Sequence, residues 1–150
     1  MPTTTDSYPL SWSHRLALLV RIWLTYAAAG LVLRRRGLAA AVERLGMRRA
    51  ERSYPVALVS RAVSRGLRIG PWEPRCLHRS LVLYTLLREQ GEAAELVIGI
   101  PAAARTSDAH AWVELGGRDV GPRPGSLGAT ELTRYPRSPV SESSAGQGRG

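Results

Sequence analysis

Cys76 is the single cysteine of the chain and lies near the start of the segment EPRCLHRSLVLYTLLREQG (73–91). Pro74 precedes it and an apolar helical pattern follows, which predicts a helix with the thiol in its first turn. The unpaired backbone N–H groups of a first turn stabilise an anion such as a thiolate, and Arg75 and Arg79 add positive charge. Free cysteine is more often a small buried apolar side chain, so position alone leaves both roles open.

A thiolate nucleophile needs a base that is close in space. The chain has three histidines, and His14 has no supporting context. His78 lies two residues after Cys76, so a helix turns the two side chains about 200° apart, and we expect an exposed ring. His110 begins HAWVEL, whose alternation predicts a strand in which Trp112 suits core packing better than substrate contact. A thiol on a helix facing an imidazole on a strand is the arrangement of papain-like catalysis, so Cys76 and His110 are the predicted pair.

Two segments, RCLHRSLVLYTLLREQGEAAELVIGI (75–100) and AHAWVELGGRDVG (109–121), together resemble the leader peptidases of lasso-peptide biosynthesis. These bacterial enzymes are the stand-alone peptidase halves of the split B protein, within the transglutaminase-like, papain-like superfamily of cysteine peptidases. The resemblance implies an α+β fold with a helical N-terminal region and a nucleophile helix packed on a small antiparallel sheet. It implies removal of the leader from a ribosomally made precursor peptide, which frees the core N-terminus for a partner lasso cyclase. A separately encoded leader-recognition protein would present the leader.

The sequence offers three possibilities for the third catalytic residue. The family pattern places an acid about a dozen residues after the histidine, where this sequence has Gly121-Pro122. Asp119 is the nearest downstream acid and is the predicted third member. A two-residue glycine turn would place it about 13 Å along the strand from His110, so it can serve only if a longer loop or a bulge shifts the register. Asp108 is the alternative, and a Cys–His dyad without an acid is the third possibility.

The composition fits one domain in a reducing cytoplasm. With 150 residues, 44% of them apolar, the chain can build one core. One cysteine excludes an internal disulfide, and no four-ligand set has zinc-type spacing, so neither a metal nor another cofactor is expected. The N-terminal segment lacks the pattern of a secretory signal. The net charge of +9 comes from arginine alone, but without a reader motif nucleic-acid binding is not expected.

Residues 16–33 carry one charge, Arg21, which makes them a marginal candidate for a membrane span. Arginine is costly in lipid, so a buried or interfacial helix is favoured and membrane contact is not the preferred interpretation. Two other functions remain open. One is acyl transfer by the same catalytic pair, and the other is a non-catalytic basic scaffold whose first 70 residues dock a membrane or the biosynthetic complex.

The chain divides into a helical N-terminal region (1–70), a transglutaminase-like catalytic core (71–125) and a tail rich in Pro, Gly, Ser and Arg (126–150) whose end is expected to be disordered. Helices are predicted over 11–36, 37–52, 54–70 and 73–91, and strands over 94–100 and, as a hairpin with a glycine turn, over 109–121.

Overall fold

The computed structural model describes residues 11–68, 75–101, 109–121 and 128–136. Within them, helices and a four-stranded antiparallel sheet form an α+β arrangement, which confirms the predicted fold class. The helices are α1 (Trp12–Leu45), α2 (Val56–Gly66) and α3 (Cys76–Glu89), and the strands are β1 (Ala94–Pro101), β2 (His110–Leu115), β3 (Arg118–Asp119) and β4 (Ala129–Tyr135).

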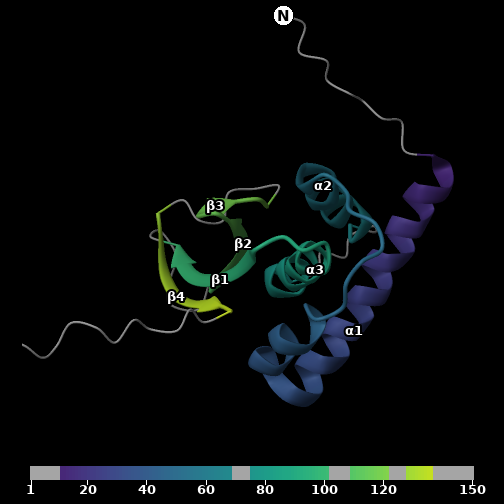
Figure 1. Ribbon diagram of the computed structural model, residues 1–150. Coiled ribbons are helices and arrows are strands. Elements are labelled where there is room, and N and C mark those ends of the chain that lie inside the picture. The colour runs from purple at the N-terminus through teal and green to yellow at the C-terminus, as the bar shows by residue number, and fades with distance from the viewer. Residues whose placement is uncertain (1–10, 69–74, 102–108, 122–127, 137–150) are drawn as a thin grey trace, which may run out of the picture.

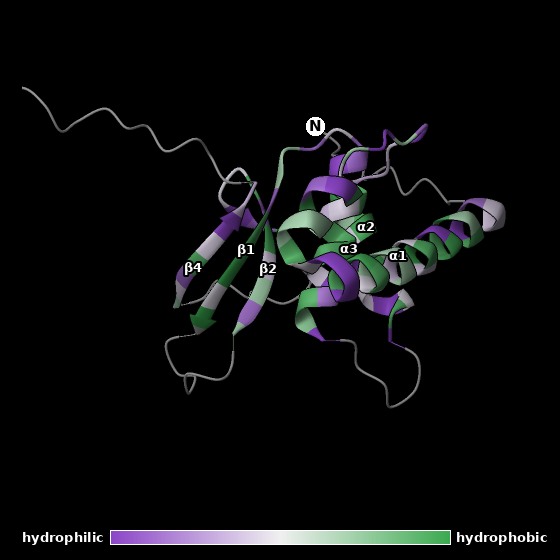
Figure 2. Ribbon diagram, turned by 90° about the horizontal axis from the view of Figure 1, so that it is seen from below, coloured by the Kyte–Doolittle hydropathy of each residue, from purple (hydrophilic) through white to green (hydrophobic). Residues whose placement is uncertain are grey.

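Helix α3 is the central element. It lies between the sheet on one side and helices α1 and α2 on the other, in both views of the ribbon (Figures 1 and 2). Every residue from Ser80 to Leu87 is buried, as is Glu89. The segment has no continuous polar face, and a helix that is apolar nearly all round is typical of the interior of a protein.

Helix α1 corresponds to two predicted helices that meet at a glycine. Gly37 has φ 78° and ψ 179°, a conformation open to glycine, and it kinks the helix at the predicted boundary. The second predicted helix was expected to reach residue 52, but it ends at Leu45. The chain beyond it is held instead by the end of α3, because the Ala50 amide donates to the Glu89 carbonyl over 2.8 Å.

The sheet has the order β3-β2-β1-β4. Gly116 and Gly117, both with positive φ, form the turn between β2 and β3, as two-residue hairpins require. The register pairs Glu114 with Asp119, which confirms the predicted turn.

Strand β4 was missed by the sequence analysis, which assigned its residues to the tail. It pairs antiparallel with β1, from Leu96 opposite Tyr135 to Pro101 opposite Ala129, with a register shift after Ile98. None of the residues in its sequence ATELTRY is buried, and it has no apolar face, as is common for a strand at the edge of a sheet. Local alternation therefore could not reveal it.

One arginine joins three strands of this sheet. Glu95 on β1 lies directly opposite Glu114 on β2, a pairing of like charges that destabilises a sheet. The Nη1 atom of Arg134 on β4 donates to both carboxylates, over 2.7 Å and 2.8 Å. Its Nη2 donates to Glu131. The hydrogen bond with Glu131 is the largest cause that raises the pKa of Arg134, and the hydrogen bonds with Glu114 and Glu95 raise it further. The other oxygen of Glu114, a residue only 7% exposed, accepts from Trp112 Nε1.

Replacing this arginine should destabilise the fold. We expect Arg134→Met to lower the free energy of unfolding by about 2 kcal/mol, less than for a fully buried pair, because Arg134 is partly exposed. Urea unfolding measures the loss, and Arg118→Met on the exposed hairpin is the matched control, with a change within about 0.5 kcal/mol. Adding Glu95→Gln to Arg134→Met should recover part of the loss, and equal stability of Arg134→Met and the parent would contradict this role.

Candidate active site

The site forms where the β3 strand stops covering the edge of β2. The backbone after β3 bonds the Val113 carbonyl, and carbonyls of alternate residues point to the same side of a strand. Further along that edge, the Ser80 hydroxyl donates to the Ala111 carbonyl over 2.7 Å. The Cys76 thiol donates to the Ala109 carbonyl over 3.9 Å. Side chains of α3 therefore take the place of β3 on this part of the β2 edge.

These two contacts flank His110. Cys76 and Ser80 are four residues apart and so lie on one face of α3, and they contact the residues just before and just after the histidine. His110 also lines a cavity of about 20 Å³, enough for about one water, together with Arg79, Ser80 and Gly121. The helix start that carries the thiol thus lies against the strand start that carries the imidazole.

Cys76 is the first residue of α3 and is half-buried. The preceding residue, Arg75, makes no side-chain cap, and the first turn holds no acidic residue. The backbone N–H groups of this turn are therefore not taken up by a capping side chain among the described residues. Free N–H groups at the N-terminal end of a helix stabilise an anion there. The anion at α3 would be either the thiolate or the oxyanion of a reaction intermediate.

His78 has a structural environment. Its ring lies 5.8 Å from that of Tyr26 on α1, between centroids, and the side chain is half-buried rather than exposed as predicted. Burial, and secondly the charge of Arg75, lower the pKa of His78. The same α3 turn that aims Cys76 at the sheet thus aims His78 at α1. The remaining histidine, His14, lies in the first turn of α1.

Asp119 lies opposite Glu114, four residues along β2 from His110, which corresponds to about 13 Å. Its Oδ1 accepts from the Gly121 amide over 2.8 Å, the local turn that aspartate often makes. The register has no shift that would bring Asp119 opposite His110. The alternative acid, Asp108, lies outside the described residues.

Two residues of the site were not singled out from the sequence for the roles they have. Ser80 holds α3 on β2 through its hydroxyl. The feature of the sequence that could have indicated this role is a hydroxyl residue one helical turn after the cysteine. Gly99 pairs with His110, and a Cβ there would come within 2.7 Å of the Trp112 ring. Trp112 is only 5% exposed, so it belongs to the core as expected. Trp72, the other tryptophan near the site in sequence, lies outside the described residues.

No group of three or more His, Cys, Asp or Glu side chains in the described part of the chain could hold a metal ion.

The family model described as "Transglutaminase-like superfamily" matches residues 16–133, well over half of the chain. The match includes both α3 and β2, which carry the site, and also most of α1. No curated protein and no solved structure matches the chain.

The register leads to a test of the third residue. Asp119→Asn keeps the oxygen that accepts from Gly121, so we expect turnover within about threefold of the parent, whereas loss of an orienting acid costs triads orders of magnitude. Steady-state turnover of the two proteins on one substrate is the measurement. A drop of about 100-fold or more, with unfolding unchanged, would instead show that Asp119 orients His110.

Proposed function

Because this chain belongs to the transglutaminase-like superfamily, we propose that it is a cysteine peptidase with Cys76 as nucleophile and His110 as general base. The superfamily supports cysteine-peptidase or acyltransferase chemistry in general. The observation that carries the assignment to these residues is the contact of the Cys76 thiol with the carbonyl of Ala109, the residue before His110. This contact supports a site that a helix-borne thiol and a strand-borne imidazole share.

The chemistry follows from this arrangement. His110 takes the thiol proton, and the Cys76 sulfur attacks the carbonyl carbon of the scissile amide. Backbone N–H groups at the start of α3 hold the oxyanion while His110 returns the proton to the leaving amine, which departs with its half of the substrate. Water, deprotonated by His110, then attacks the thioester, releases the new carboxylate and restores the thiol.

The substrate we propose is the precursor of a lasso peptide, cut between leader and core. The resemblance of residues 75–100 and 109–121 to the leader peptidases supports this choice. In that role the enzyme acts in the bacterial cytoplasm with a separately encoded leader-recognition protein, and a lasso cyclase receives the freed core N-terminus. The same thioester could instead be attacked by an amine, so the identity of the acceptor, water or amine, is read from the mass of the product.

Removing either member of the pair should stop the reaction. We expect Cys76→Ala to abolish cleavage and His110→Ala to slow it by about 10³-fold or more, because the two act as one unit. The assay is mass spectrometry of a lasso-peptide precursor after incubation with each variant and a leader-recognition protein.

His78→Ala is the matched control for the histidine, since the His78 ring packs on α1 away from the sheet. It should cleave at close to the parent rate. The midpoint of thermal unfolding should hardly move in Cys76→Ala, because the thiol makes one long hydrogen bond. Cleavage retained by Cys76→Ala would remove the assignment.

A further inference from the structure

Helix α1 is apolar on two sides, but the fold covers only one of them. Leu18, Ile22 and Ala29 are buried in the core shared with α2 and α3. The other side of the helix exposes large apolar side chains, up to 81% for Trp12 and 66% for Leu24. We call this set the α1 stripe: Trp12, Leu16, Leu19, Val20, Leu24 and Leu31.

The α1 stripe is continuous. At 100° per residue its members fall within an arc of about 140°, turned away from the buried side, and from Trp12 to Leu31 they extend over about 28 Å. Figure 1 shows α1 at the margin of the molecule, with α3 between it and the sheet. A continuous exposed apolar face of this length is typical of a docking surface.

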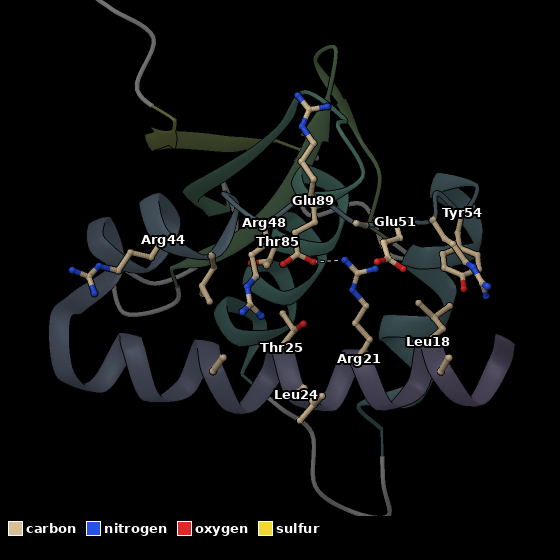
Figure 3. A pocket seen from close by; sticks show the side chains of 16 residues that line it. Leu18, Arg21, Leu24, Thr25, Arg44, Arg48, Glu51, Tyr54, Thr85 and Glu89 are labelled. Atoms are coloured by element: carbon tan, nitrogen blue, oxygen red, sulfur yellow. Dashed lines mark hydrogen bonds and ion pairs between the residues drawn. The ribbon is translucent and has the colours of Figure 1, made fainter. Parts of the chain in front are cut away.

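The surroundings of the α1 stripe are basic. From Trp12 to Val42 the helix has no acidic residue, and three successive arginines, 34–36, follow the last member of the stripe. Beside the stripe, α1 and the chain after it enclose a groove of about 810 Å³ (Figure 3). Leu24 belongs to both the groove and the stripe. Five arginines line the groove. Arg21 pairs with Glu89, and the other four form no ion pair within the described residues: Arg44, Arg48, Arg49 and Arg52.

We propose that the α1 stripe docks on the surface of an anionic lipid bilayer. An interfacial helix buries its apolar side at the level of the acyl chains while arginines around it bind lipid phosphates. The stripe and the arginine-lined groove supply these two features side by side. The net charge of +9 favours an anionic surface and opposes a second copy of this chain. The sheet, on the far side of α3, stays in water.

The helix lies on the bilayer rather than across it. Its length and composition would allow a span, and 22% of its most apolar 18-residue window is buried in the fold. A span would pull Leu18 and Ile22 out of the core and separate Arg21 from Glu89, a carboxylate that is only 8% exposed and paired with this arginine (Figure 3). Arg21 would then lie in the hydrocarbon without the carboxylate that pairs with it, which is costly.

Vesicle binding tests the proposal directly. Phosphatidylcholine vesicles with and without about one quarter phosphatidylglycerol are sedimented with the full chain, and we expect at least about tenfold tighter binding to the anionic vesicles. Val20→Glu/Leu24→Glu, at two exposed positions, should weaken that binding about tenfold or more. Ala57→Glu/Leu132→Glu adds the same charge at exposed positions on α2 and β4, outside the α1 stripe, and should bind like the parent. Unfolding curves establish that each variant is folded.

Several outcomes would overturn the proposal. One is that the folded parent fails to bind vesicles, and another is that the two double variants lose binding to anionic vesicles equally. The third such outcome is bound protein that resists extraction at alkaline pH, as a spanning helix does. Failure to bind vesicles together with a dimer that Val20→Glu/Leu24→Glu dissociates would assign the stripe to a second copy. Cys76→Ala should bind vesicles like the parent, so this result stands apart from the proposed peptidase activity.

Discussion

Strand β2 has a backbone edge that β3 is too short to cover, and the fold depends on how that edge is satisfied. β3 has two residues, so it supplies no donors to the carbonyls of Ala111, which is buried, and Ala109, which is exposed. The Cys76 thiol and the Ser80 hydroxyl supply them from one face of α3. The short, buried Ser80 contact fixes both the rotation of α3 about its axis and its position along the strand, and the long thiol contact adds little to stability. With that face on β2, the opposite side of α3 is left for α1 and α2 to cover.

The same contacts determine the chemistry available at the site. A helix that starts at the strand edge brings its unpaired N–H groups, its first side chain and the start of β2 together. In the proposed mechanism, the nucleophile and the oxyanion donors come from the first turn of α3, and the base is the first residue of β2. At the position where the resemblance to the leader peptidases implies an acid, Gly121 lines the small cavity beside His110 and offers no side chain. In the proposed thiol–imidazole pair, backbone contacts and core packing therefore take the part of an orienting acid.

Much of this fold could be predicted from the sequence, because its signals are local. Apolar periodicity indicates the helices, Gly37 marks the kink in α1, and the glycine pair gives the hairpin and its register. That register already argued that Asp119 lies far from His110. Strand β4 could not be predicted, since what holds it is pairing with β1 and the contacts of Arg134 with two other strands, not an apolar pattern of its own. Nor does an apolar helix indicate which of its sides the fold covers, so the exposed stripe of α1 emerged only from the packing.

The rate at which iodoacetamide alkylates Cys76 in the folded protein near neutral pH tests most directly whether the thiol and His110 act as a pair. The parent should be alkylated at least about tenfold faster than His110→Ala, and His78→Ala should match the parent, because only His110 lies beside the thiol contact. Equal rates in the parent and His110→Ala, or alkylation of the parent only after unfolding, would contradict a catalytic thiol and leave Cys76 as a packing residue.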